Sequence, residues 1–219
     1  MRHGLPFTVP LALTLSALFA CGTPEAPANP GTTPARPALQ RELVRLGMLD
    51  QTARIAFTAS AVTDTALMRS ILAIDSVLTA RLRDIVREHG WPARSLAGEA
   101  GARAAFLIVQ HSPSNAFQRE MLPHIIAAAD AGEASRADAA MLEDRVLTDE
   151  GKPQRYGTQF RIVAGELVAY PIEDPATLDE RRAAVGLMPM AEYVKLLEQT
   201  YEGPVRYPAD DRPPNDTAG

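Results

Sequence analysis

The sequence predicts a mainly α-helical fold, a bundle of about six or seven helices with one β-hairpin packed on it. In the first two thirds of the chain, apolar residues recur at helical spacings of three and four over long segments. Two short apolar runs at residues 160–163 and 167–172 flank Ala164 and Gly165, a pattern typical of a hairpin. An isolated hairpin is only marginally stable, so we expect this one to lie against the helices.

The first twenty residues are typical of an exported bacterial lipoprotein. A basic start precedes an apolar stretch at residues 9–20, which is too short to span a membrane. The tetrapeptide LFAC, ending at Cys21, resembles a lipobox, in which the cysteine is acylated with fatty acids such as palmitate. Cys21 is the only cysteine, so no disulfide can form within the chain. We expect a cell-envelope protein whose partner is the membrane that holds its lipid anchor. Gly22, where Asp would retain the protein at the inner membrane, favours the outer membrane and a domain facing the periplasm.

Composition divides the rest of the chain into one domain and two tails. Residues 21–37 are rich in Pro, Ala, Thr and Gly, and such a segment buries too little apolar surface to offset its ordering entropy. Residues 204–219 are similar, with added aspartates. We therefore predict a disordered tether, a single helical domain with its hairpin at residues 38–203, and a disordered acidic tail. The overall composition, 46% hydrophobic and 22% charged, is ordinary for a globular domain.

Several common classes of protein are disfavoured by the sequence. The net charge of -5 argues against a nucleic-acid partner, because neutralising phosphates requires a surplus of Lys and Arg. Gly151-Lys152 lacks the upstream glycine and the Ser or Thr of a phosphate-binding loop. An H-E-x-x-H motif is missing, and the three histidines after the signal peptide are scattered along the sequence. We predict neither a metal nor a cofactor.

The first predicted helix, residues 38–59, has a carboxylate in its apolar stripe. Asp50 occupies the gap in a stripe formed by Leu39, Leu43, Leu46, Ala53 and Phe57. In one interpretation the stripe turns toward Leu49, and Asp50 and Arg54 form a solvated pair. In the other, Asp50 is half-buried and faces a pocket.

The next two predicted helices supply the core. Residues 64–89 carry a sustained apolar face that ends at Gly90, and we expect Asp75 to be solvated, off that face. Residues 99–111 are apolar nearly all round, as in a helix surrounded by others. Gln110 and His111 stand at the end of this central helix. His111 is either a satisfied core or capping residue, or part of a site built inside the bundle.

Four further helices are predicted from start signals. Asn115 and Gln118 have the spacing of a capping box for residues 115–131. Another helix begins at Ser135 and carries Asp144 and Arg145 on its last turns, where they are either a surface ion pair or site residues. After the hairpin, residues 177–186 and a segment that starts at Pro189 are expected to be helical.

The turn at residues 151–159, GKPQRYGTQ, is the strongest indication of a pocket. Its side chains include Gln154, Tyr156 and Gln159, which make directional hydrogen bonds, and glycines and a proline bend the backbone around them. We expect one polar pocket where helix 38–59, the end of helix 99–111, the end of the helix that begins at Ser135 and this turn meet. The candidate ligand-binding residues are Asp50, Gln51, Arg54, Gln110, His111, Arg145, Gln154, Tyr156 and Gln159, and the catalytic candidates are His111, Asp144 and Arg145.

Five short motifs carry a resemblance to a known family. They are DQxxR from Asp50, HGWP from His89, QH from Gln110, DR from Asp144 and GKPQRYGTQ from Gly151. On these motifs the chain resembles a bacterial family of domains of unknown function, and the resemblance covers most of the folded region. Because that family has no established activity, the resemblance supports the limits of the domain and implies no mechanism.

Two functions are consistent with these residues. The first is binding of a polar ligand, such as a peptide or a cell-wall fragment, by the Gln, Tyr and Arg side chains. The second is a hydrolase or lyase in which His111 acts as general base, oriented by Asp144 or Asp50, while Arg145 stabilises developing negative charge. Binding is favoured because the sequence shows no evident nucleophile. A buried histidine with a shifted pKa that faces a carboxylate would favour the enzyme.

Overall fold

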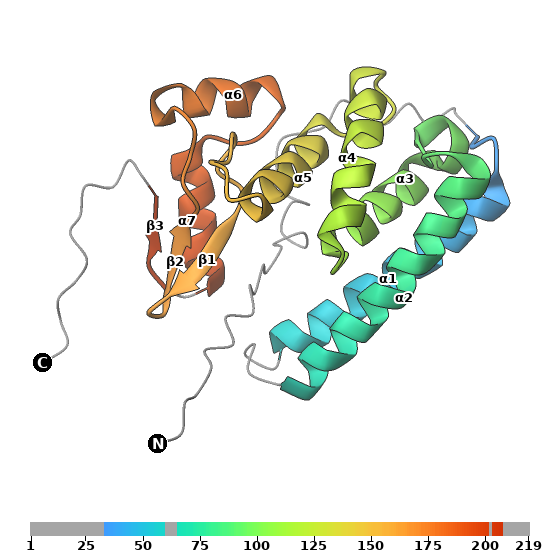
Figure 1. Cartoon of the computed structure of the whole chain (residues 1–219), viewed down its shortest axis with the longest axis horizontal. Helices are drawn as coiled ribbons and strands as arrows, with labels where there is room; N and C mark the ends of the chain where they lie inside the picture. Colours follow the sequence, from blue (N-terminus) through green and yellow to red (C-terminus); the bar gives the residue numbers. More distant parts are fainter. Residues whose placement is uncertain (1–32, 60–64, 202, 208–219) are drawn as a thin grey trace, which may run out of the picture.

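The computed structural model describes residues 33–59, 65–201 and 203–207 (Figure 1). Within these residues the chain is mainly α-helical with a small β-sheet, which confirms the predicted fold class. The elements are α1 (Pro37–Ala59), α2 (Thr65–His89), α3 (Arg94–His111), α4 (Asn115–Asp130), α5 (Arg136–Asp149), β1 (Phe160–Val163), β2 (Glu166–Ala169), the 3-10 turn η2 (Pro175–Thr177), α6 (Leu178–Ala184), α7 (Met190–Tyr201) and β3 (Val205–Arg206).

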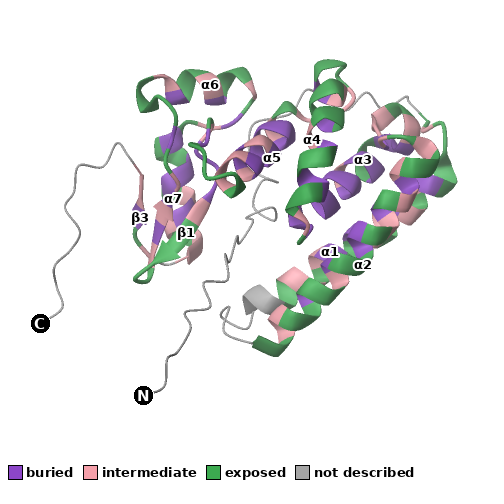
Figure 2. Cartoon of the chain, viewed as in Figure 1, coloured by how far each residue is buried: buried purple, intermediate pink, exposed green. Residues whose placement is uncertain are grey.

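Helices α1, α2 and α3 form the centre of the bundle. Ion pairs from Glu42 to Arg81 and from Arg54 to Asp75 show that α1 and α2 are antiparallel. The contact between Gly47 and Ala104 lies one turn before the point where Asp50 meets the end of α3, so α1 and α3 run in the same direction. Figure 2 shows α3 as the most completely buried of the helices, as predicted from its apolar sequence.

The start of α3 lies five residues before the predicted one. Gly98 has a positive φ of 70° within α3, so the helix contains a kink there, and the predicted segment 99–111 is the part after the kink. A β-carbon at Gly98 would lie 2.5 Å from the side-chain nitrogen of Gln40 on α1. Glycine is therefore required both by the backbone conformation and by the close approach of α1.

Helices α4 and α5 begin with serine caps. Ser135 Oγ accepts a hydrogen bond from the backbone N–H of Asp138, as predicted. The predicted capping box of α4 is wrong, because the cap is Ser114 and not Asn115. The amide of Gln118 instead donates to the backbone carbonyls of residues 109, 110 and 112, which satisfies the carbonyl groups at the end of α3.

The predicted hairpin is present, and it is part of a three-stranded sheet. Strands β1 and β2 pair in antiparallel fashion across Ala164 and Gly165, which both have positive φ. Strand β3 pairs with β2 in parallel, and Val205 is buried. The ordered region therefore extends past residue 203, where we predicted its end. Val205 is the residue that changes this boundary, because it adds an apolar side chain to the core under the sheet.

The apolar side chains form two clusters. One lies inside the bundle and involves α1 to α5, and the other lies between the sheet, α6 and α7. Helix α5 stands between the bundle and the sheet in Figure 1. Residues of α5 can therefore contact both parts of the molecule.

Some predictions concern residues outside the described part of the chain. The predicted signal peptide, Cys21 and most of the predicted tether lie before residue 33, and residues 208–219 of the predicted tail lie after the last described residue. Among the helices that the structure describes, none combines the length and apolar character needed to span a bilayer.

Candidate functional site

Asp50 of α1 and His111 of α3 form a buried pair. His111 Nδ1 lies 2.8 and 2.9 Å from the two carboxylate oxygens of Asp50. The side chains are 2% and 0% exposed. Because a carboxylate accepts hydrogen bonds, Nδ1 of the neutral imidazole carries the proton, and Nε2 is then the basic nitrogen. Of the two interpretations of Asp50, the structure supports the buried carboxylate.

Two neighbours on α1 hold Asp50 in place. Gln51 Nε2 donates to the Asp50 carboxylate at 2.6 Å. Arg54 forms an ion pair with Asp50 at 3.0 Å, and its other terminal nitrogen donates to both oxygens of Asp75 on α2 at 2.9 and 2.8 Å. The predicted pair of Asp50 and Arg54 therefore exists, but it is part of a buried network and not a solvated surface pair.

Asp75 is a member of this network that the sequence analysis placed wrongly in solvent. The residue is 5% exposed, and burial raises the pKa of its carboxyl to about 6 while Arg54 opposes that rise. Asp75 lies four residues after Ile71 and three before Leu78, inside the apolar stripe of α2. The signal that identified Asp50, a carboxylate interrupting a helical stripe, was thus also present here.

The environment of His111 keeps the imidazole neutral. Burial lowers the pKa of His111 to about 4, Asp50 opposes this change, and the positive charges of Arg54 and Arg145 reinforce it. A neutral imidazole oriented by a carboxylate is the arrangement that general-base catalysis uses. The same arrangement is also compatible with a purely binding role.

Arg145 belongs to α5, the helix between the bundle and the sheet (Figure 1), and its charge reaches the network around Asp50 and His111. Its charge acts on His111 in the bundle, and Tyr170, which follows β2, acts in turn on Arg145. Burial and the charge of Arg54 lower the pKa of Arg145 to about 10. Arg145 as a whole is half-buried, but its Nε and Nη2 atoms are shielded from solvent. Neither atom has a hydrogen-bond partner in the described part of the chain.

Gln110 is a second buried group whose polar atoms lack partners. It is fully buried, and neither its amide nitrogen nor its amide oxygen has a hydrogen-bond partner among the described residues. Its place in α3, next to His111, puts it at the same end of the helix. Buried polar groups are normally paired, so each exception requires an explanation.

Asp144 has a different role from that of Arg145, its neighbour in α5. Its carboxylate accepts from the backbone N–H groups of Arg155, Tyr156 and Thr158 at 2.6 to 3.0 Å, and from the hydroxyl of Thr158 at 2.9 Å. Burial raises the pKa of Asp144, and these four donors oppose the rise. Asp144 therefore holds the turn of residues 151–159 against α5.

The polar side chains of the turn at residues 151–159 make their hydrogen bonds mainly with the turn itself and with the strand residues next to it. Gln154 is fully buried, donates to the carbonyls of Gln159 and Tyr170, and accepts from the N–H of Gln159. The Gln159 amide donates to Thr158 Oγ1 at 3.0 Å. The backbone of Tyr156 binds Asp144 and accepts from Arg182, and its ring lies beside Arg155. The turn thus docks the hairpin, and its hydrogen bonds explain its composition.

The structure divides the predicted site residues into two groups and adds Asp75 to the first. We call Asp50, Arg54, Asp75, His111 and Arg145 the polar centre, and Gln51 and Gln110 adjoin it. The second group, which serves the turn, comprises Asp144, Gln154, Tyr156 and Gln159.

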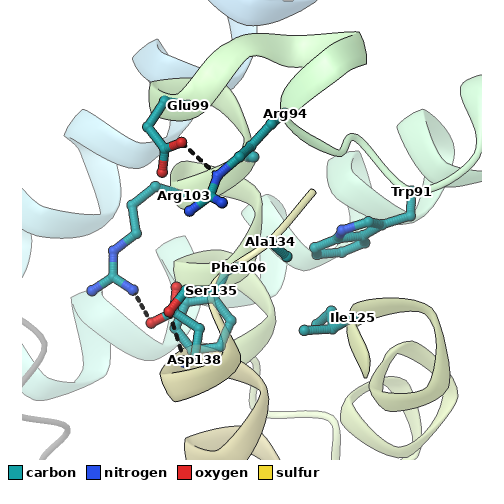
Figure 3. A pocket seen from close by; sticks show the side chains of 10 residues that line it. Trp91, Arg94, Glu99, Arg103, Phe106, Ile125, Ala134, Ser135 and Asp138 are labelled. Carbon is teal, nitrogen blue, oxygen red and sulfur yellow. Dashed lines mark hydrogen bonds and ion pairs between the residues drawn. The ribbon is translucent and has the colours of Figure 1, made fainter. Parts of the chain in front are cut away.

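A small cavity elsewhere in the bundle does not explain these features. It lies between Trp91 and the start of α5 (Figure 3) and has a volume of about 20 Å³, enough for about one water molecule. The two arginines at this cavity already face carboxylates, since Arg94 pairs with Glu99 at 2.5 Å and Arg103 pairs with Asp138. The buried indole N–H of Trp91 has no partner in the described residues and fits one such water.

Comparison with known proteins identifies the family to which the chain belongs. Neither the curated proteins nor the solved structures that were searched gave a match. Residues 37–206 match a family model, and these limits agree with the extension of the fold to β3. The match covers most of the chain and confirms the resemblance, so the protein belongs to a family of unknown function, DUF6624.

Proposed function

We propose that this protein binds a small polar ligand at the polar centre. The observation that carries the proposal is the guanidinium of Arg145, which has two nitrogens shielded from solvent and without a hydrogen-bond partner in the described residues. An unmet buried donor costs about 1–3 kcal/mol, and the cost is larger for a charged group. Functional groups are often retained at such a cost to stability. A ligand that accepts hydrogen bonds from Arg145 would remove this cost.

The position of the polar centre also supports binding. Arg145 lies where the bundle and the sheet with its helices meet, and ligand sites are frequent at such junctions. The turn at residues 151–159, where the sequence suggested the pocket, uses its polar groups on its own backbone and on α5. We therefore place the ligand at Arg145 and not at the turn.

A second function, that of a hydrolase or lyase, is favoured by the pair of Asp50 and His111. Asp50 orients the imidazole through Nδ1, and the neutral His111 can take a proton at Nε2. Arg145 would stabilise negative charge that develops on the substrate. Asp144 is not the orienting carboxylate in this scheme, because its oxygens hold the turn.

We expect the protein to bind its ligand in the cell envelope. The sequence LFAC, ending at Cys21 behind an apolar segment, supports a lipid anchor, and Gly22 supports the outer membrane. Peptides and cell-wall fragments are polar ligands available to a protein that faces the periplasm.

A panel of peptides and cell-wall fragments, screened by thermal shift and by turnover on the purified full chain, tests both functions. Binding predicts a rise in melting temperature that Arg145→Gln abolishes and that Arg87→Gln, a change in an arginine whose side chain is 74% exposed, does not alter. Catalysis predicts in addition that Asp50→Asn lowers turnover by on the order of 10²-fold or more while binding remains. A ligand response that survives Arg145→Gln would contradict the proposed site.

A further inference from the structure

We infer that the ligand of the polar centre presents an oxyanion, a carboxylate or a phosphate group, to Arg145. This inference rests on the proposed binding function and specifies its chemistry. It depends on which nitrogens of the guanidinium are unpartnered and on the charges around them.

The two unpartnered nitrogens of Arg145 form one edge of its guanidinium. Nε and Nη2 direct parallel N–H bonds outward from the same edge, within the plane of the guanidinium, and both atoms are buried without partners in the described residues. This fork matches the two oxygens of a carboxylate or the oxygens of a phosphate. Arg182, which is fully buried, differs in this respect. Its Nε donates to the carbonyl of Met188 and its Nη1 to the carbonyl of Tyr156, so that only Nη2 has no partner in the described residues.

The charges near Arg145 leave its guanidinium without a compensating anion. Arg54 adds a second positive charge that lowers the pKa of Arg145, and the opposing effect of Asp149 is weaker. Asp149 is also engaged by the side chain of Asn115 and lies 3.8 Å from Arg119. Tyr170 opposes the lowering of the Arg145 pKa more strongly than Asp149 does, but a tyrosine is normally uncharged near neutral pH and is then no compensating anion.

Arg54 cannot serve as the anion-binding group in place of Arg145. Its terminal nitrogens already contact Asp50 and Asp75, and these contacts fix it between α1 and α2. An oxyanion beside Arg145 would therefore be bound by Arg145 and favoured at longer range by the charge of Arg54.

The experiment follows the Nε–H resonance of Arg145 by ¹H–¹⁵N NMR on the full chain. Because Nε is shielded from solvent, its proton should exchange slowly enough to be observed, and the signal is assigned by its loss in Arg145→Lys. The probes are inorganic phosphate, acetate and acetamide at constant ionic strength. Acetate and acetamide have nearly the same shape, so their comparison isolates the charge, and phosphate against acetate distinguishes the two oxyanion classes.

We expect a saturable downfield shift with acetate or phosphate and none with acetamide. Arg145→Lys keeps the charge but loses the fork, so anion affinity, followed by calorimetry, should fall at least tenfold, whereas Arg87→Gln should leave it unchanged. If acetamide binds as tightly as acetate, polar-ligand binding stands and the oxyanion inference is overturned. If none of the three probes shifts the resonance, both the oxyanion inference and the proposed binding site at Arg145 are overturned. If Arg145→Lys does not fold, the Nε–H signal is assigned by through-bond correlation to the backbone of Arg145, and the titration of the unmodified chain still decides.

Discussion

Gly47 of α1 lies directly against Ala104 of α3, so that a β-carbon added to Gly47 would be 2.8 Å from the β-carbon of Ala104. A glycine within a helix costs about 1 kcal/mol relative to alanine, and this close approach explains why it is tolerated. Three residues further along α1, Asp50 meets His111. The small side chains at residues 47 and 104 thus set the distance at which the central pair of the polar centre forms.

Replacing Gly47 by Val should separate α1 from α3. We expect a loss of about 2 kcal/mol in the free energy of unfolding, because overpacking at a tight helix contact costs roughly 1–3 kcal/mol. Urea denaturation measures the loss. The matched control is Ala56→Val, which adds a β-branched residue at an exposed position of the same helix and should change stability by less than about 1 kcal/mol. Equal effects of the two substitutions would contradict the tight contact.

His111 should make stability depend on pH. Its pKa is lowered to about 4 in the folded chain from an ordinary value near 6.5, so the unfolded chain binds the extra proton between these values. The contribution of His111 is present above about pH 6.5 and is lost as the pH falls toward 4. Asp75, with a pKa raised to about 6, acts in the opposite sense, since its contribution is lost as the pH rises from about 4 to 6. The unmodified chain should therefore show only a weak pH dependence in this range.

The variant His111→Asn isolates the histidine contribution. The stability difference between the unmodified chain and His111→Asn should shrink by about 2 kcal/mol from pH 7 to pH 4.5, because only the unmodified chain must then protonate a buried imidazole. Denaturant titrations at both pH values measure this. The other charged groups that act on His111 are Asp50, Arg54 and Arg145, and they are present in both proteins. A difference that stays constant with pH would show that His111 titrates normally.

Asp144→Ala should destabilise the fold without abolishing the ligand response of the folded fraction. The substitution removes the acceptor for three backbone N–H groups and the Thr158 hydroxyl, and we expect a loss of roughly 3 kcal/mol. Amide hydrogen exchange at residues 155–158 should accelerate. As a control, Asp84→Ala removes a carboxylate from an exposed ion pair with Arg87 and should cost less than about 1 kcal/mol. If the folded variant fails to respond to ligand, Asp144 takes part in ligand binding and the role assigned to it here is wrong.

Cys21→Ser tests the proposed lipid anchor. The unmodified chain should incorporate a labelled palmitate analogue and fractionate with the outer membrane, because the several acyl chains of a bacterial lipoprotein anchor far more firmly than one. The variant should incorporate no label. Its domain should retain the melting temperature of the parent protein, since Cys21 lies outside residues 37–206 of the family match. An unlabelled parent protein released into the medium would refute the anchor.

The helical periodicity of the sequence was sufficient to predict the bundle and the central pair of its polar centre, Asp50 and His111. Asp50 interrupts an apolar stripe and His111 ends a helix that is apolar all round, and both facts can be read locally. Asp75 carried the same signal in α2 and was missed, because its significance depends on Arg54, which is 21 residues away in the sequence. The pairing of β3 with β2 was also missed, because a two-residue strand has too short a pattern to recognise.

Only the tertiary structure could separate the roles of Asp144 and Arg145. Consecutive residues of an α-helix point about 100° apart, so the rotation of α5 between the bundle and the sheet directs Asp144 to the turn and Arg145 to the polar centre. The composition of the turn showed that its side chains make hydrogen bonds, but not with which partners. Those partners were fixed by packing, since a buried amide such as that of Gln154 takes the donors and acceptors that the fold places next to it. The sequence by itself therefore determined the helices and the polar residues that their burial would enclose, and the packing of α5 decided which of these residues are engaged by the fold and which keep unmet hydrogen bonds.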